Sequence, residues 1–227
     1  MRILTIGGTF NPIHIGHIRL AVEASEALGF DRIEWIPCFS PGHKKATDLL
    51  PYALRVELVR LATHDLYGSV VNDIESRLPT PSFTYQTLSA LATAESCAER
   101  FFVVGQDEFC RLHLWYRGRY LVSLAHLLIT GNSGAGPTAF HETLDRFWPD
   151  SRQTDPPPSL PAAYEFRSGR RALFLPLPYL EIRSSLVRKR WLAGRDLRHL
   201  LPTGVLDELI SHRSLVSETW RQALASA

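Results

Sequence analysis

Two histidines, His14 and His17, stand three residues apart just after a glycine-opened loop, Gly7-Gly8-Thr9-Phe10-Asn11-Pro12. The apolar run before this loop, residues 1–6, predicts a strand, and the periodicity after it predicts a helix over residues 16–28. A strand, a glycine loop and a helix start bring backbone N–H groups and the positive end of a helix dipole to one point, where they can bind a phosphate. The two histidines face the same side of the helix start and add charge-tunable donors. The pattern therefore favours nucleotide chemistry at phosphorus.

The elements that must position these residues alternate between strand and helix. Apolar runs and alternating patterns predict further strands at residues 32–37, 70–74, 101–104, 124–130 and 172–176. Helical periodicity predicts helices at residues 52–64, 83–94, 184–193 and 203–213. This order predicts an α/β fold, a Rossmann-like doubly wound parallel sheet with a small C-terminal helical part over residues 182–227. Ligands of such sheets bind at the carboxyl ends of the strands.

One segment interrupts the alternation. Residues 131–171 are rich in glycine and proline and include the run Pro156-Pro157-Pro158. We expect a long surface insertion here, partly mobile, with one short helix at residues 138–147. The 227 residues as a whole are expected to form a single domain.

The stretch from Gly7 to His17 resembles the signature of the HxGH nucleotidyltransferase superfamily and, within it, the bacterial nicotinate-nucleotide adenylyltransferases. The resemblance implies adenylyl transfer from ATP to nicotinate mononucleotide, giving deamido-NAD and pyrophosphate, with Mg²⁺ held mainly by the nucleotide and water. It implies catalytic roles for His14 and His17 and an acceptor contact for Asn11. ATP and phosphate contacts are implied for Gly8, Thr9, Phe10 and Gly16.

The proposed chemistry needs no general base. The acceptor phosphate is already an anion at neutral pH, since its second pKa is about 6. It can attack the α-phosphorus of ATP in line, so the enzyme must hold two polyanions together and stabilise the charge that develops. Histidine, lysine, arginine and backbone N–H groups are suited to that task.

Two later segments resemble phosphate motifs of the same family. Residues 41–44, Pro-Gly-His-Lys, are similar to Pro-Pro-His-Lys and imply a phosphate contact for Lys44, although isolated lysines are often solvated surface. Residues 182–188 are similar to Ile-Ser-Ser-Thr-x-Ile-Arg, with departures at Arg183 and Ser185. Hydroxyl residues at a helix start leave N–H groups free for an anion, so the phosphate-binding residues are expected to be Ser184, Ser185 and Arg188.

Three further features complete the expected site: two indicate the acceptor side, and one, Gly105 with Asp107, indicates the ATP side. Residues 82–88 resemble Ser-Tyr-Thr-x-Asp-Thr-Leu, which implies that Thr84 receives the pyridine carboxylate, with Gln86 replacing an aspartate. Gly105 and Asp107 follow a buried strand, where glycine permits backbone approach and the carboxylate can bind ribose or adenine. The nearby aromatic pair, Trp115 and Tyr116, is suited to stack on nicotinate or equally to fill the core.

Composition narrows the class of protein. The chain carries 25 basic and 23 acidic residues, a net charge of +2, which argues against a general nucleic-acid binder. Three cysteines without CxxC spacing fit a reducing cytosol, so we expect a cytoplasmic protein. The sequence contains no apolar run near the ~18 residues of a membrane span, no zinc pattern and no Walker A motif, and it does not specify an oligomeric state.

Other functions remain possible at this point. Adenylyltransferases acting on nicotinamide mononucleotide or phosphopantetheine, and the cytidylyltransferases, share the first motif. Class I aminoacyl-tRNA synthetases also carry His-Ile-Gly-His but need a later Lys-Met-Ser-Lys-Ser-like loop, and the only methionine here is Met1. A non-catalytic nucleotide-binding module is a further alternative, because fold does not fix function. The five polar residues that such a module would have little reason to keep are His14, His17, Lys44, Asp107 and Arg188.

Overall fold

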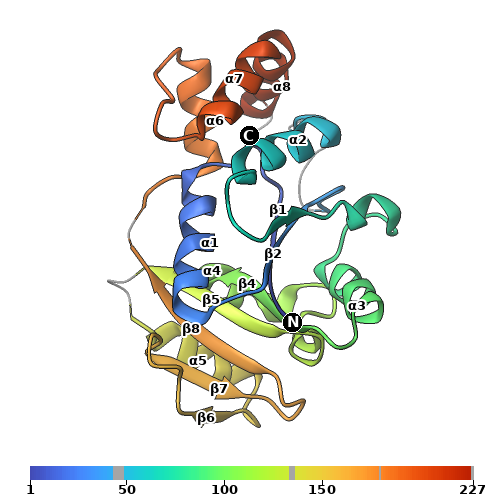
Figure 1. Cartoon of the computed structure of the whole chain (residues 1–227), viewed down its shortest axis with the longest axis vertical. Coiled ribbons are helices and arrows are strands. Elements are labelled where there is room, and N and C mark those ends of the chain that lie inside the picture. The colour runs from blue at the N-terminus through green and yellow to red at the C-terminus, as the bar shows by residue number, and fades with distance from the viewer. Residues whose placement is uncertain (43–48, 133–135, 179, 226–227) are drawn as a thin grey trace. The chain divides into compact units, whose positions relative to one another are not determined.

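The computed structural model describes residues 1–42, 49–132, 136–178 and 180–225 (Figure 1). Its strands form an eight-stranded sheet in the order β3-β2-β1-β4-β5-β8-β7-β6. The strands are β1 (Arg2–Gly8), β2 (Arg32–Pro37), β3 (Ser69–Val71), β4 (Glu99–Gly105), β5 (His126–Asn132), β6 (Arg152–Thr154), β7 (Ala162–Glu165) and β8 (Arg171–Leu177). The α-helices are α1 (Ile15–Leu28), α2 (Tyr52–Thr63), α3 (Thr84–Ala94), α4 (Gln106–Cys110), α5 (Thr138–Phe147), α6 (Ser184–Leu192), α7 (Thr203–Ser211) and α8 (Arg213–Ala225). Short 3₁₀ helices are η2 (Ile74–Arg77), η3 (Leu112–Leu114) and η4 (Gly118–Ser123).

The central strands are parallel, as the alternating order of elements predicts. β4 pairs in parallel with β1 and with β5, and β5 pairs in parallel with β8. The four residues from Phe101 to Val104 are all buried. A strand covered on both faces needs apolar residues at every position, which explains why this run does not alternate. The predicted α/β class is confirmed.

The segment from residue 131 to residue 171 differs from the expected surface insertion. Its predicted helix is present as α5, but the two strands that follow, β7 and β6, extend the sheet antiparallel beyond β8. Phe140, Leu144, Leu160 and Ala163 are buried there. The prolines misled the prediction because Pro156-Pro157-Pro158 lies between these strands rather than inside one.

Two smaller predictions also need correction. The strand expected at residues 70–74 ends at Val71 and is followed by the 3₁₀ helix η2. The helix expected at residues 203–213 ends at Ser211, and a further helix, α8, follows at once.

The chain divides into two compact units assembled from interleaved segments, and the single domain expected from the sequence stays a prediction. Unit 1 comprises Met1–Ile6, Ala21–Ile33 and Phe83–Tyr179. Its apolar interior includes the aromatic cluster of Phe109, Phe140 and Phe174, with Trp148 stacked on Phe109 at 5.7 Å. This packing joins α4 and α5 to the sheet strand β8 (Figure 1).

Unit 2 comprises Gly7–Leu20, Glu34–Ser82 and Leu180–Ala227. In it α2 packs on α7, and α8 packs on both α6 and α7 (Figure 1). Val205, Leu209, Val216 and Trp220 are fully buried between these helices. The glycine loop and both histidines of the first motif belong to this unit.

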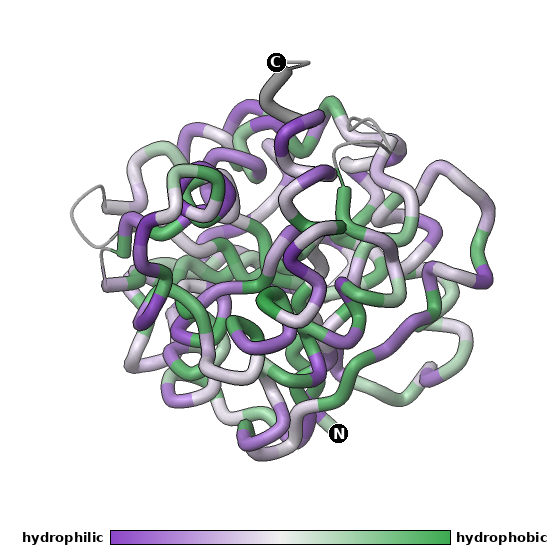
Figure 2. Tube along the Cα trace, turned by 90° about the horizontal axis from the view of Figure 1, so that it is seen from above, coloured by the Kyte–Doolittle hydropathy of each residue, from purple (hydrophilic) through white to green (hydrophobic). Residues whose placement is uncertain are grey.

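Hydrophobic and hydrophilic residues are interspersed along the chain (Figure 2). Among the described residues, no helix combines the length and apolarity that crossing a bilayer requires.

Candidate active site

The glycine loop after β1 has a conformation fixed by Phe10. This residue is buried and has a φ of 47°, in the left-handed region that side chains rarely adopt. Its ring lies edge-on to His17, with centroids 5.2 Å apart. A Cβ at Gly8 would come within 2.9 Å of the same ring, so only glycine fits there. The sequence predicts phosphate contacts for Gly8 and Phe10, and the structure adds that the Phe10 ring leaves no room for a side chain at Gly8.

A backbone hydrogen bond orients the second histidine of the motif. The His14 N–H donates to Nδ1 of His17 at 3.1 Å. Because Nδ1 accepts, a neutral His17 ring carries its proton on Nε2 and presents that N–H as a donor. The two imidazole rings lie 3.8 Å apart between centroids.

Both histidines are held neutral at physiological pH. Burial lowers the pKa of His14 from 6.5 to about 4. Burial also lowers the pKa of His17 well below 6.5, and the neighbouring His14 lowers it further because two imidazolium charges would repel. The pair therefore offers hydrogen-bond donors rather than permanent charges.

His14 has a buried ring nitrogen that lacks a partner. The residue is 6% exposed, and its Nδ1 has no hydrogen-bond partner among the described residues. A Cβ on Gly16 would lie 3.0 Å from that nitrogen, so the glycine makes room for the imidazole as well as for the predicted approach of phosphate. Since buried polar atoms are normally satisfied, Nδ1 is a candidate for contact with a ligand or an ordered water.

A buried arginine that the sequence analysis missed supports the loop. Arg55 on α2 is 1% exposed, and its guanidinium donates to the carbonyls of Leu50 (3.1 Å), Thr9 (2.7 Å) and Cys38 (2.7 Å). It thereby links the first motif to the end of β2. Its signal in the sequence is its place on the apolar face of α2, three and seven residues before Leu58 and Ala62.

The end of β2 provides a second connection to the loop. The Cys38 N–H donates to the Gly8 carbonyl at 2.8 Å. Burial, with the nearby Glu75 carboxylate, raises the pKa of the Cys38 thiol to about 12. Cys38, Cys97 and Cys110 are all free cysteines, and Cys97 is exposed.

The second phosphate motif contacts the first directly. Ser184, the first residue of α6, donates from its hydroxyl to the Pro12 carbonyl at 2.8 Å. One turn later, Arg188 donates from Nη1 to the Asn11 carbonyl at 2.9 Å. The structure therefore brings the two predicted phosphate motifs together within unit 2. The exposed Ser185 lies beside them at the helix start.

The side-chain oxygen of Asn11 already has hydrogen-bond donors within the protein. It is 4% exposed, and its Oδ1 accepts from the Leu50 N–H at 3.1 Å and from Nε1 of Trp220 at 3.5 Å. These contacts make it an anchor between the loop and α8, and its predicted contact with the acceptor stays a prediction. Lys44, the other predicted phosphate ligand of this unit, lies outside the described residues.

Apart from Asn11, the predicted acceptor residues belong to unit 1, where Tyr116 is part of an exposed aromatic cluster. Thr84 is the first residue of α3, and Phe83 before it stacks on Tyr116 with centroids 4.6 Å apart. The guanidinium of Arg117 lies 5.0 Å above Tyr85 and 5.6 Å above Tyr116. Tyr116 is 46% exposed. Trp115 is half-buried, in neither the core nor a fully solvated position.

Gly105 and Asp107 lie where the sequence analysis expects them. Gly105 ends β4, and Asp107 stands in the first turn of the short helix α4 with its side chain exposed.

Across the part of the chain that the structure describes, no group of three or more His, Cys, Asp or Glu side chains could hold a metal ion.

Comparison with known proteins identifies the family of this chain. The sequence profile of the Cytidylyltransferase-like family matches residues 5–190. The chain belongs to the cytidylyltransferase-like family. The match spans all the motifs discussed above, from the glycine loop to the start of α6.

Several relatives in this family carry a more specific name. The probable nicotinate-nucleotide adenylyltransferase of Pelobacter propionicus is 31% identical over 226 residues, which cover 96% of this chain and 99% of that protein. The protein of the same name from Desulfatibacillum aliphaticivorans is 32% identical over 208 residues, covering 90% and 95% of the two chains.

A solved structure has the same fold as this chain. The nicotinic acid mononucleotide adenylyltransferase of Plasmodium falciparum, complexed with NaAD, matches with a TM-score of 0.72 at 18% identity. The match covers 94% of this chain and 97% of that chain. The predicted Rossmann-like architecture is thus confirmed independently of the motifs.

Proposed function

We propose that this chain transfers the adenylyl group of ATP to nicotinate mononucleotide, releasing pyrophosphate and forming nicotinate adenine dinucleotide. The observation that carries the proposal is the pair of neutral histidines beside the glycine loop, with His17 held as an Nε2–H donor and His14 left with an unpartnered buried nitrogen. The names of the relatives that align over nearly the whole chain support the same reaction.

In the proposed step, an oxygen of the acceptor phosphate forms a bond to the α-phosphorus of ATP. The bond from that phosphorus to its bridging oxygen breaks, and pyrophosphate leaves with the electron pair. No proton is transferred, because the attacking oxygen is already anionic. Charge grows on the α-phosphoryl oxygens and on the leaving group, where fixed N–H donors stabilise the transition state more than the ground state.

The residues of unit 2 would provide those donors. We assign the His17 Nε2–H, the ring of His14 and the loop N–H groups of Gly8 and Thr9 to the phosphates of ATP. Arg188 and the N–H groups at the start of α6 add positive potential from the second motif. We also assign Lys44 to these phosphates, because residues 41–44 resemble the Pro-Pro-His-Lys segment of the family. Mg²⁺ would enter as part of the nucleotide substrate, bound to phosphate oxygens and water.

The residues of unit 1 would select the acceptor. The N-terminus of α3 at Thr84 offers backbone N–H groups that favour a carboxylate over an amide. We assign Trp115 to stack on the pyridine ring, with Tyr116 beside it, and Gly105 and Asp107 to the adenosine part.

The test is pyrophosphate release with ATP and Mg²⁺, offering nicotinate mononucleotide, nicotinamide mononucleotide and phosphopantetheine in parallel. We expect a kcat/KM for nicotinate mononucleotide at least about tenfold above the other two, equivalent to about 1.4 kcal/mol. Equal use of the amide would remove the carboxylate role of the α3 N-terminus. Release with none of the three would favour a binding module.

A further inference from the structure

The C-terminal helices of unit 2 line an open cavity of about 790 Å³ that contains none of the motif residues. It lies among the end of α6, the following loop, α7 and α8. Its volume is in the range of small-molecule sites. The side chains that decide its chemistry are Trp191, Arg195, Arg198, Ile210, Arg213 and Arg221.

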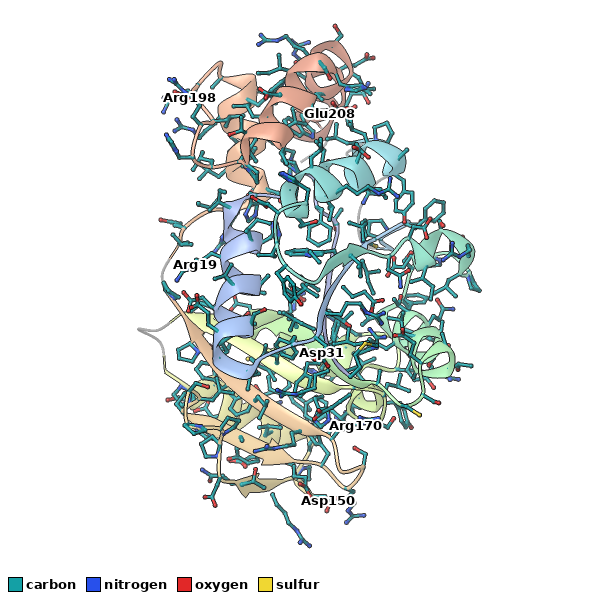
Figure 3. The ribbon with its side chains drawn as sticks, in the orientation of Figure 1. Arg19, Asp31, Asp150, Arg170, Arg198 and Glu208 are labelled. Atoms are coloured by element: carbon teal, nitrogen blue, oxygen red, sulfur yellow. The ribbon has the colours of Figure 1, made fainter. Side chains whose placement is uncertain are left out.

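The lining of this cavity carries an excess of positive charge. Four arginines face two carboxylates, Asp196 and Glu218. Arg198 is already paired, since its Nε donates to the Asp196 carboxylate at 2.8 Å (Arg198 is labelled in Figure 3). Arg195, Arg213 and Arg221 make no ion pair within the described residues. Guanidinium groups that outnumber the carboxylates beside them are suited to bind a phosphate chain through their planar forks.

The same cavity has an apolar side. Ile210 on α7 is 44% exposed, and Leu206 lies one turn before it. The Trp191 ring forms another wall, with the Arg213 guanidinium 5.7 Å above it. An exposed aliphatic and aromatic surface beside three unpaired arginines matches a ligand that is planar and apolar at one end and polyanionic at the other.

A chain of contacts leads from the cavity to the first motif. Trp191 packs edge-on against the buried Trp220, with centroids 5.7 Å apart and an angle of 84°. The Nε1 of Trp220 lies 3.5 Å from Oδ1 of Asn11 in the glycine loop. Asn11 also accepts the hydrogen bond of Arg188, which stands on the same helix as Trp191. A ligand that moves Trp191 therefore acts on residues that hold the loop.

We propose that this cavity is a second nucleotide site, taking a nucleoside polyphosphate, and that its occupation changes nucleotide handling at the glycine loop. Arg195, Arg213 and Arg221 bind the phosphates, and the base packs on Ile210 and Leu206. The site has no reaction of its own and acts by differential binding to two arrangements of the loop.

Binding is tested by calorimetric titration of the whole protein with ADP. Two sites are expected for the wild type. Arg188→Ala should remove the motif site, and Arg195→Ala/Arg213→Ala should weaken the second site at least tenfold. The charge-matched control, Arg152→Ala/Arg170→Ala, changes two arginines of unit 1 and should keep both sites (Arg170 is labelled in Figure 3). Circular dichroism, together with the conservative Arg195→Lys/Arg213→Lys variant, separates lost binding from lost folding.

A single ADP site in the wild type, or a second site of unchanged affinity in Arg195→Ala/Arg213→Ala, overturns the proposed site. Titration with inorganic pyrophosphate tests the role of the base, and we expect at least tenfold weaker binding than ADP at the second site. Equal affinity would overturn recognition of a nucleoside.

Coupling is tested by the initial rate against ATP concentration. Since ATP can occupy both sites, the wild type should depart from a single hyperbola, and Arg195→Ala/Arg213→Ala should restore one. Hyperbolic kinetics in both proteins would overturn the coupling to the loop.

Discussion

The glycine loop of unit 2 and the aromatic cluster of unit 1 are built in opposite ways. In the loop, Phe10, Asn11 and His14 are buried, and Arg55 and Arg188 bind its carbonyls. In the cluster, Tyr116 is largely exposed and is held by stacking on Phe83 rather than by burial.

This difference corresponds to two chemical tasks. Donors that stabilise charge in a transition state must be fixed before the substrate arrives, because their reorientation would cost energy during the reaction. A surface that recognises a flat ring needs area and a correct orientation, and it can remain open to solvent until the ring arrives. We therefore expect substitutions in the loop to lower kcat and substitutions in the cluster to raise the KM for the acceptor.

His17→Ala should produce the largest effect. Removing the Nε2–H donor is expected to lower kcat about 100- to 1,000-fold, equivalent to about 3–4 kcal/mol of transition-state stabilisation. Initial rates with both substrates saturating provide the measurement. His64→Ala, which changes an exposed histidine at the end of α2, is the control and should leave kcat unchanged. A His17→Ala protein with wild-type kcat would contradict the assigned role.

Arg55→Ala should destabilise the region around the glycine loop. The change leaves the carbonyls of Leu50, Thr9 and Cys38 without their donor, and we expect a loss of about 3 kcal/mol in the free energy of unfolding. Urea unfolding measures it. Arg60→Ala on the same helix removes an exposed arginine and should cost less than about 0.5 kcal/mol. If the two variants unfold alike, Arg55 does not support the loop.

Acid should destabilise both units through histidines whose pKa is lowered by burial, namely His14 and His17 beside the glycine loop and His126 in unit 1. Burial lowers the pKa of His14 and of His126 from 6.5 to about 4, although Glu99 beside His126 acts to raise it. Between these values the unfolded chain binds more protons than the folded one. Stability should therefore fall as the pH decreases from about 6.5 to about 4, by up to about 1.4 kcal/mol per pH unit for each histidine.

Urea unfolding at a series of pH values checks this dependence. His14→Gln and His126→Gln should each reduce the slope, and His64→Gln should not. Wild-type stability that stays constant between pH 6.5 and pH 4 would show that none of His14, His17 and His126 has the lowered pKa.

Trp115→Ala should have the smallest effect, confined to the acceptor. Loss of the stacking ring is expected to raise the KM for nicotinate mononucleotide about tenfold, equivalent to about 1.4 kcal/mol, with little change in the KM for ATP. Tyr120→Ala, an exposed aromatic residue of η4, is the control. An equal rise of both KM values would remove Trp115 from the acceptor site and weaken the contrast between the two regions.

Most of the fold could be predicted from periodicity. The strand that becomes β4 is recognised from a short, continuously apolar run, and the helix that becomes α5 from its helical periodicity. The short strands β6 and β7 could not be predicted, because their register depends on β8, which comes later in the chain. The helix α8 was missed since its start at Arg213 follows α7 without a glycine or proline to mark the boundary.

Site residues that stand at motif positions could be predicted from the sequence. Residues whose role depends on a contact with a distant part of the chain could not. His14, His17 and Arg188 stand at motif positions and lie together in unit 2. The part of Arg55 in the site depends on carbonyls of Thr9 and Cys38, which no local pattern reveals. The anchoring of Asn11 by Trp220 depends on a pairing 209 residues apart.

The thiol beside the glycine loop has a consequence for chemical damage. A cysteine reacts with peroxides and alkylating agents as its thiolate, and with a pKa of about 12 the Cys38 side chain is almost entirely protonated at neutral pH. The exposed thiol of Cys97, in unit 1, is open to such reagents. Oxidants and electrophiles should therefore modify Cys97 in unit 1 first, and the thiol beside the glycine loop should stay unmodified under conditions that already modify Cys97.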